Sequence, residues 1–255
     1  MPDDRLRPKK RLGQHFLRDP ATAARLAALL RPRPDESILE IGPGEGILTH
    51  HLAALHAPRF VAVEFDADAV ALLQRQSWPG GTRIVHSDFL AWPLPPGSDP
   101  WVWAGNLPYQ ITSPILFRLL AERERVRRAV FMMQREVAQR IASPPGTREC
   151  GILSVLLGAW YSFETGFDLG PGAFRPPPKV WSRVIALERK PHPPAVDFAA
   201  LLAVVKAGFG QRRKQLANTL RPLDLDLPPA WAALRAENLS LDQWLELAGQ
   251  LAART

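Results

Sequence analysis

The sequence predicts an α/β fold, in which a mainly parallel sheet carries helices on both faces, followed by a small all-helical domain. Three observations support this prediction. Short apolar runs alternate with helical patterns from residue 38 to residue 133. Beyond the proline-rich segment 191–194 the pattern is helical to the end of the chain. The 255 residues, of which 46% are hydrophobic and 22% charged, are enough for one large or two modest domains.

From residue 21 onward the chain repeats the order strand, loop and helix. We expect strands over five short apolar runs: Ile38–Ile41, Phe60–Phe65, Thr82–Ser87, Trp101–Ala104 and Ala129–Met133. Helices are expected over Thr22–Leu30, from Ile47, over Ala67–Gln76 and from Ser113-Pro114. In the last of these, serine would cap the helix and proline would occupy its first position.

After Met133 this rhythm changes. We expect helices over Glu136–Ala142 and Ile152–Trp160, strands near Phe163–Phe167 and Val184–Leu187, and a stiff loop at Arg175-Pro176-Pro177-Pro178. Further helices are expected over Phe198–Phe209, Arg212–Leu220, Pro229–Arg235 and Leu241–Ala253, the last with a Ser240/Gln243 capping box. The expected organisation is a basic arm (1–20), a sheet domain (21–190) and a helical domain (191–255).

The composition excludes several classes of protein. Cys150 is the single cysteine, so an intramolecular disulfide and a cysteine-based zinc site are excluded. The longest apolar stretch, Gly151–Trp160, is far shorter than the ~20 residues of a membrane span, and the N-terminus has no apolar signal core, so we expect a cytoplasmic protein. Lysine and arginine number 32 against 25 aspartate and glutamate, which favours nucleic acid as a partner, with an anionic membrane surface second.

A glycine-rich segment, Glu40-Ile41-Gly42-Pro43-Gly44-Glu45-Gly46, joins the first expected strand to a helix. Glycines let the backbone approach a ligand closely, and the helix N-terminus offers unpaired N–H groups. The spacing is G-x-G-x-G and differs from the G-x-G-x-x-G of a dinucleotide fingerprint. It therefore favours a nucleoside with a small charged tail and argues against an NAD-dependent oxidoreductase. A tight structural turn is the alternative interpretation.

The next two strands also end in acidic residues. Glu64 at a strand tip can accept hydrogen bonds from both hydroxyls of a ribose, although a single glutamate can equally be a solvated or salt-bridged carboxylate. Asp88 can accept from an adenine amino group while Phe89 covers a face of the base. A simple helix cap is the alternative for Asp88. Their positions after a glycine loop favour a nucleoside site.

The fourth strand ends in Asn106-Leu107-Pro108-Tyr109, the most specific chemical signal in the chain. An exocyclic base amine is a poor nucleophile because its lone pair is delocalised into the ring. The Asn106 side-chain oxygen and the Leu107 carbonyl could accept from that amine and orient its lone pair toward an electrophile. Pro108 stiffens the loop, and Tyr109 offers a face on which the base can stack. Phe174 could cover the opposite face, although alone it is more typical of a core aromatic.

These motifs resemble those of the ribosomal RNA adenine N6-dimethyltransferases, in the same order and over almost the whole chain. The matching segments are Gly13–Leu17, the glycine loop, Val63-Glu64, Ser87–Phe89, Asn106–Tyr109, Phe174–Val180 and Phe209–Leu220. The resemblance implies a Rossmann-like class I methyltransferase sheet and S-adenosylmethionine as methyl donor. The cofactor residues that it implies are His15, Leu17, Gly42, Gly44, Glu64, Asp88, Phe89 and Asn106. The family usually has Asn at the position of His15.

The resemblance further implies methylation of N6 of two adjacent adenosines near the 3′ end of small-subunit (16S) ribosomal RNA, giving N6,N6-dimethyladenosine during ribosome biogenesis. Two basic clusters then become candidate RNA contacts: Arg5, Arg7, Lys9, Lys10 and Arg11, and Arg212, Arg213 and Lys214. Two alternatives remain. One is a large-subunit ribosomal RNA adenine methyltransferase of the antibiotic-resistance type, and the other is an assembly factor in which catalysis is dispensable. Because Glu64, Asp88 and Asn106 are all present, we expect an active enzyme. We also expect a monomer without a bound metal.

Overall fold

The computed structural model describes residues 6–79, 81–97 and 99–254, and the chain divides into two compact units. The first unit contains the chain up to Ala138 together with Glu164–Glu188, and the second contains Gln139–Phe163 and the chain from Arg189 onward. The division between Glu188 and Arg189 lies next to the domain boundary expected at residue 190. Segment 139–163, expected in the sheet domain, groups with the C-terminal helices, because its apolar helix packs against them.

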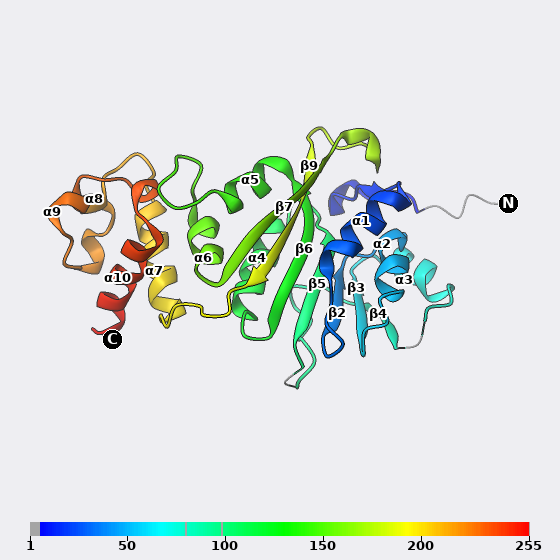
Figure 1. Cartoon of the computed structure of the whole chain (residues 1–255). Coiled ribbons are helices and arrows are strands. Elements are labelled where there is room, and N and C mark those ends of the chain that lie inside the picture. The colour runs from blue at the N-terminus through cyan, green and yellow to red at the C-terminus, as the bar shows by residue number, and fades with distance from the viewer. Residues whose placement is uncertain (1–5, 80, 98, 255) are drawn as a thin grey trace. The chain divides into compact units, whose positions relative to one another are not determined.

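Seven strands among the described residues form one sheet, whose order is β4 (Thr82–His86), β3 (Phe60–Glu64), β2 (Ser37–Ile41), β5 (Trp101–Asn106), β6 (Val126–Gln134), β9 (Ser182–Arg189) and β7 (Tyr161–Leu169). Figure 1 labels these strands. Strands β2 to β6 run parallel, and β9 runs antiparallel to β6. The chain adds β3 and β4 on one side of β2 and then returns to add β5 on the other. The strand order therefore reverses between β2 and β5, the place where sheets of this kind bind ligands.

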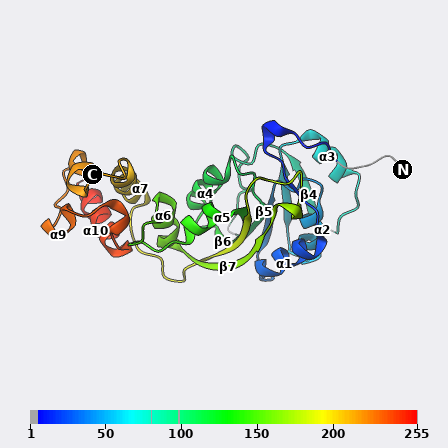
Figure 2. The ribbon, with the colours of Figure 1, turned by 90° about the horizontal axis from the view of Figure 1, so that it is seen from above.

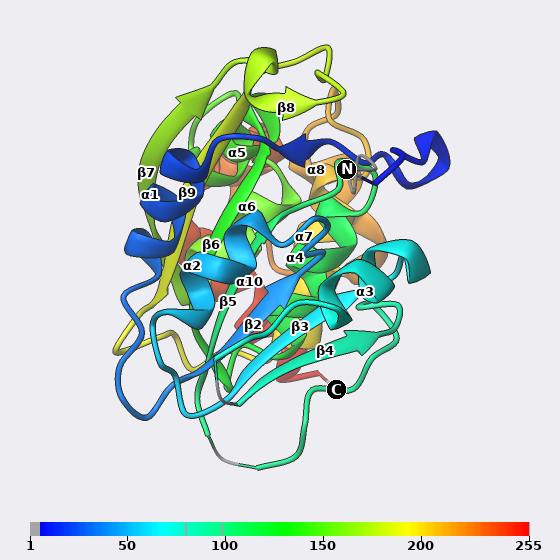
Figure 3. The ribbon, with the colours of Figure 1, turned by 90° about the vertical axis from the view of Figure 1, so that its right-hand side faces the viewer.

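Helices cover both faces of the sheet, as the alternating pattern predicted. Figures 2 and 3 show α1 (Pro20–Leu30) and α2 (Ile47–Ala53) on one face and α3 (Ala67–Gln74) and α4 (Thr112–Ala121) on the other. A small two-stranded sheet, β1 (Phe16–Leu17) with β8 (Phe174–Arg175), joins the N-terminal segment to the segment before β9.

The core under α1 and α2 is built from alternate residues of the strands. Leu26 and Leu52 of the two helices meet Ile38, Val102 and Met132 of the sheet, and all five are buried. A strand places successive side chains on opposite faces, so a fully apolar strand serves two cores at once. This is why β2, β3 and β5 read as continuous apolar runs.

Side-chain caps explain where several helices begin. The Asp19 carboxylate accepts from the N–H groups of Ala21 (3.1 Å) and Thr22 (3.0 Å) at the start of α1. The expected Ser113 cap of α4 is wrong: the helix already begins at Thr112, whose hydroxyl donates to the carbonyl of Pro108 (3.1 Å).

In the second unit α6 (Ile152–Trp160), α7 (Phe198–Phe209) and α10 (Leu241–Ala252) pack together, with α5 (Arg135–Ala142) at the division between the units. The Phe209 and Trp244 rings stack at 5.7 Å. A Cβ at Gly208 would overlap the Trp244 ring, so this helix position requires glycine. The Ser240/Gln243 capping box is confirmed, with bonds of 3.3 and 2.8 Å.

Two helices of this unit are shorter than expected. α8 covers Leu216–Thr219 and α9 covers Pro229–Ala232. Residues 211–214 before α8 form turns, because they are exposed and contribute no apolar face to the core. No helix in the described part of the chain is long and apolar enough to cross a membrane.

Candidate active site

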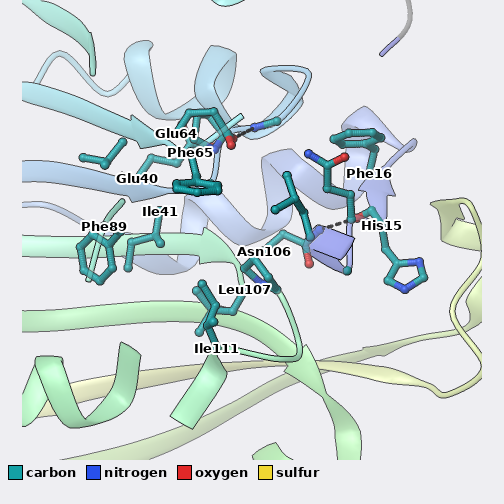
Figure 4. Close-up of a pocket in the computed structure, with 18 of the residues that line it drawn as sticks. His15, Phe16, Glu40, Ile41, Glu64, Phe65, Phe89, Asn106, Leu107 and Ile111 are labelled. Atoms are coloured by element: carbon teal, nitrogen blue, oxygen red, sulfur yellow. Dashed lines mark hydrogen bonds between the residues drawn. The ribbon is translucent and has the colours of Figure 1, made fainter. Parts of the chain in front are cut away.

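A cavity of about 270 Å³ lies at the carboxyl ends of β2, β3 and β5, where the strand order reverses. Its walls contain every residue expected at the cofactor: His15, Leu17, Gly42, Gly44, Glu64, Asp88, Phe89 and Asn106. Leu107, Pro108 and Tyr109 also line it. In Figure 4, Phe89 and Ile41 lie toward one end of the cavity, and Phe16 and His15 lie toward the other.

The glycine loop brings main chain to the cavity wall without side chains. Gly42 and Gly44 have φ values of +66° and +58°, which L-residues rarely adopt, and a Cβ at Gly42 would point into open space. The Gly44 N–H donates to Glu64 Oε2 (3.0 Å), and the Asp66 N–H donates to Glu64 Oε1 (2.8 Å). These two bonds fix the Glu64 carboxylate and leave lone pairs on both oxygens for a ligand. Burial raises the pKa of Glu64, and the two backbone bonds oppose that rise.

A second buried carboxyl group, Glu40, lines the same cavity and is 1% exposed. Its Oε2 atom has no hydrogen-bond partner among the described residues, and the nearby Thr49 hydroxyl has none either. Burial raises the pKa of Glu40 to about 8, and the Glu64 charge adds to the rise. A buried polar atom without a partner is costly, so this wall suits a ligand that brings a donor or a positive charge. The sequence placed Glu40 in the glycine motif but assigned it no role.

The cavity wall around Phe65 and Phe89 is more apolar. Asp88 Oδ1 accepts from the Leu90 N–H (2.9 Å), so part of this carboxylate caps a turn, whereas the helix cap given as the alternative is not seen because residues 89–91 form turns. Phe89 is buried and packs edge-on against Trp103 at 5.3 Å, so its ring is largely committed to the core. Phe65 also lines the cavity and is 53% exposed, which makes it better placed to cover a base. Sequence reasoning passed over Phe65, although it directly follows Glu64.

Asn106 ends β5 with its side-chain amide held in one orientation. Asn106 lines the cavity, and its Nδ2 donates to the main-chain carbonyl of His15 (2.9 Å), which leaves Oδ1 as the acceptor of this amide. The Leu107 N–H is bonded to the carbonyl of Met132 (2.9 Å), which fixes the loop that follows. The side chain of His15 lines the cavity, and its Nδ1 donates to the carbonyl of Pro176 (2.7 Å).

Tyr109 completes this side of the site. Its hydroxyl is bonded to the hydroxyl of Ser182 (2.8 Å), a fully buried residue at the start of β9. Burial raises the pKa of Tyr109, and the Ser182 bond opposes this. The His15 ring lies 5.5 Å from the Tyr109 ring, centroid to centroid, and the two are tilted by 31°. The aromatic face expected from Tyr109 therefore has the His15 ring beside it.

Phe174, expected to cover a base, does not line the cavity in this structure. Phe174 is 2% exposed, belongs to the core under α1 and is absent from the cavity wall. Its strand β8 pairs with β1, where Phe174 lies opposite Leu17, and this pairing turns the ring inward. Proline-rich neighbours in the sequence could not reveal that orientation.

The N-terminal cluster is partly neutralised by carboxylates of the first unit. Lys9 forms ion pairs with Asp66 and with Asp68 (2.7 Å), and Gln14 Nε2 also donates to Asp66 (2.8 Å). Lys9 therefore ties the arm to the start of α3, and its expected RNA contact is not supported. Arg7, Lys10 and Arg11 are exposed, and Arg5 lies outside the described residues.

The second basic cluster lies in the helical unit. Arg212 donates to the carbonyls of Arg148 (3.1 Å) and Cys150 (3.2 Å), so its guanidinium holds the loop before α6. Arg213 and Lys214 are exposed and line a separate hollow with Arg148 and Arg235. These four cations share one surface of this unit.

Comparisons with known proteins agree with this geometry. A model of the family described as ribosomal RNA adenine dimethylase matches residues 5–244. A relative from Porphyromonas gingivalis, ribosomal RNA small subunit methyltransferase A, is 44% identical over 255 residues, covering 95% of this chain and 97% of the relative.

Two solved structures share the fold. A dimethyladenosine transferase from Plasmodium falciparum superposes with a TM-score of 0.78 at 21% identity, covering 91% of this chain and 96% of that one. The 23S rRNA methyltransferase ErmE superposes with a TM-score of 0.73 at 28% identity, covering 93% and 99%. The sheet is thus of the Rossmann-like methyltransferase type that the sequence predicted. The chain belongs to the ribosomal RNA adenine dimethylase family.

Proposed function

We propose that this protein transfers methyl groups from S-adenosylmethionine to N6 of two adjacent adenosines near the 3′ end of small-subunit (16S) ribosomal RNA, giving N6,N6-dimethyladenosine during ribosome biogenesis. The small-subunit relative at 44% identity supports this target over large-subunit RNA, since ErmE is 28% identical. The charge of +7 suits an RNA substrate, and the substrate implies a cytoplasmic enzyme.

One observation carries the proposal: the Asn106 amide, whose nitrogen is bonded to the His15 carbonyl, lines a cavity that also contains two buried carboxyl groups. The bond from Nδ2 to the His15 carbonyl prevents the amide from turning its nitrogen toward the cavity. An acceptor in this position can bind an exocyclic amine, whereas a donor there would repel it.

The cavity walls fit S-adenosylmethionine, which supplies a methyl group on a positively charged sulfur. Glu64 would accept from the ribose hydroxyls, and Phe65 and Ile41 would contact the adenine. The orphaned Oε2 of Glu40 would accept from the ammonium group of the amino acid end, which would approach the open space at Gly42. Two buried carboxyl groups in one wall complement a ligand that carries two positive charges and one negative charge.

In this proposal the chain promotes transfer by orienting the target amine. Asn106 Oδ1 and the Leu107 carbonyl accept from the two amine hydrogens, which favours a tetrahedral nitrogen and directs its lone pair into the cavity. Tyr109 holds the base by stacking, and Ser182 fixes the Tyr109 ring. Transfer makes the nitrogen acidic, so water can accept the proton and no general base is required.

The decisive experiment supplies the purified protein and S-adenosylmethionine to small and large ribosomal subunits from cells that lack this gene. Mass spectrometry of RNA fragments then locates the product. We expect N6,N6-dimethyladenosine at two adjacent positions of the small-subunit RNA. Modification of large-subunit RNA alone would establish the antibiotic-resistance alternative. Tight binding of NADH without binding of S-adenosylmethionine would refute the whole assignment.

A further inference from the structure

An exposed apolar segment borders the proposed target-base wall. Residues 176–181, here called the β8–β9 loop, connect β8 to β9. Among the described residues four large apolar side chains are exposed, and two of them, Val180 (42%) and Trp181 (48%), lie in this loop. The other two, Phe65 and Leu90, line the cavity described above. All exposed large apolar side chains in this set therefore lie at the cavity or on this loop.

We propose that Trp181 is a stacking platform for an unpaired RNA base that flanks the target adenosine. This inference rests on the proposed function and extends it, because it names a second nucleotide that the enzyme recognises. The cavity residues would then hold the target base and the β8–β9 loop its neighbour.

Both ends of the loop are bonded to the residues that form the target-base wall. At one end the carbonyl of Pro176 accepts from His15 Nδ1 (2.7 Å). At the other end Ser182, which directly follows Trp181, is bonded to the Tyr109 hydroxyl (2.8 Å). The loop and the wall therefore form one connected structure, and a base on Trp181 would be close to the next nucleotide of the same strand.

The loop is stiff, and the Trp181 ring is supported on one side. Three successive prolines, 176–178, restrict the backbone. The Trp181 carbonyl accepts from the Arg135 N–H (2.9 Å), and the ring lies 3.7 Å from the position of a Cβ at Gly170. The Arg135 guanidinium lies 5.6 Å from the ring centroid, within the range of a cation–π contact. A preformed aromatic surface loses little conformational entropy when a ligand binds.

The charge of this region selects RNA as the occupant. Segment 175–183 contains Arg175, Lys179 and Arg183 and no acidic residue. Arg175 is paired with Glu45 (2.5 Å) and Arg183 forms a bidentate pair with Asp168 (2.5 and 2.9 Å), so two of these cations are partly neutralised and held in place. Surfaces that bind single-stranded RNA combine cations for the backbone with aromatic rings for the bases. A flat aromatic ring among cations fits a nucleotide better than an apolar protein segment.

The test compares Trp181→Ala with Trp181→Phe, and Val180→Ala is the matched control because it shortens an equally exposed neighbour that cannot stack. The probe is a short single-stranded RNA with two adjacent adenosines, and in further versions an abasic nucleotide replaces the residue on either side of the pair. We expect Trp181→Ala to weaken RNA binding by about 5- to 150-fold, the equivalent of ~1–3 kcal/mol of stacking. Trp181→Phe and Val180→Ala should remain within about threefold of wild type.

The abasic RNAs distinguish stacking from a general disturbance. One abasic position should weaken wild-type binding as much as Trp181→Ala does, and on that RNA the variant should bind like wild type. Unchanged binding by Trp181→Ala, or an equal reduction on every abasic RNA, would overturn the inference. With undermethylated small subunits, the variant should raise KM while kcat and S-adenosylmethionine affinity stay unchanged. If wild type methylates the subunits and Trp181→Ala does so equally well, this inference fails and the proposed function stands.

Discussion

Replacing Glu40 by Gln tests whether the orphaned carboxyl group serves a cationic ligand. Glutamine keeps the size and one carbonyl oxygen of the side chain but cannot ionise. In the free protein Glu40 is fully buried, and its pKa is raised to about 8. A cation that binds beside it favours the ionised form. Binding of S-adenosylmethionine near neutral pH should therefore release a proton in wild type and none from Glu40 in the variant.

The magnitudes follow from the pKa. At pH 7 a group with a pKa of about 8 is roughly 90% protonated, so binding should release ~0.9 proton. The affinity of wild type should rise almost tenfold from pH 6 to pH 7 and level off above pH 8. Stability has the opposite sign, because the raised pKa favours the protonated native state. The contribution of Glu40 to the free energy of unfolding is fully present below pH 4.5 and is lost as the pH rises to 8. At pH 7 about 3 kcal/mol of it has been lost.

Calorimetry in buffers of different ionisation enthalpy measures the released protons, and thermal unfolding at pH 5 and pH 8 measures the stability. Glu40→Gln should bind S-adenosylmethionine at least about tenfold more weakly at pH 8. It should also unfold at a higher temperature than wild type at pH 8, with a smaller difference at pH 5. Protons released by the ligand itself are the same for both proteins, so they cancel when wild type and variant are compared. Equal proton release by wild type and variant would show that Glu40 does not face the bound cation.

Three further predictions concern other parts of the molecule. Asn106→Ala should abolish methyl transfer while S-adenosylmethionine affinity, measured by calorimetry, stays within roughly tenfold, since one orienting interaction is worth ~3–4 kcal/mol in the transition state. Wild-type turnover on small subunits would contradict the role of its amide. Gly208→Ala should destabilise the helical unit in thermal unfolding, because the new methyl group overlaps Trp244 and outweighs the ~1 kcal/mol gain in helix propensity. An unchanged unfolding temperature would show that Trp244 moves freely. Neutralising Arg213 and Lys214 should lower the logarithmic salt slope of small-subunit binding by ~0.7–0.9 for each phosphate that the variant no longer neutralises, and an unchanged slope would place the RNA surface elsewhere.

Periodicity predicted the regular elements best where one face had to be buried. The predicted bounds of Ile152–Trp160 and Phe198–Phe209 agree with the structure because apolar residues continue to both ends of these helices. The helix expected over Arg212–Leu220 is shorter because its first turn is charged and exposed, so helix propensity had no packing to support it. The Ser113 cap failed for a related reason: the Thr112 hydroxyl already bonds to the preceding loop.

The site was predictable where each residue directly follows a strand. Glu64 and Asn106 end parallel strands and Asp88 lies just beyond one, and because the carboxyl ends of these strands meet at one edge, their common cavity follows from the fold. Contacts between distant segments were not predictable. The ion pair of Lys9 with Asp66 joins residues 57 positions apart, and the inward direction of Phe174 depends on its pairing with β1. Neither of these contacts leaves a recognisable pattern in the neighbouring sequence.

His15 explains how a departure from the usual residue of the family can leave the catalytic loop unchanged. The Asn106 amide is oriented because it donates to the main-chain carbonyl at this position, which any residue supplies. The place of that carbonyl is set by the β1–β8 pairing that begins at Phe16 and by the contact of Gln14 with Asp66. The side chain is free to take another role, and its ring stands beside Tyr109 and bonds to the β8–β9 loop. In the proposed function, histidine at this position would alter the wall around the target base and leave the orientation of the Asn106 amide as it is.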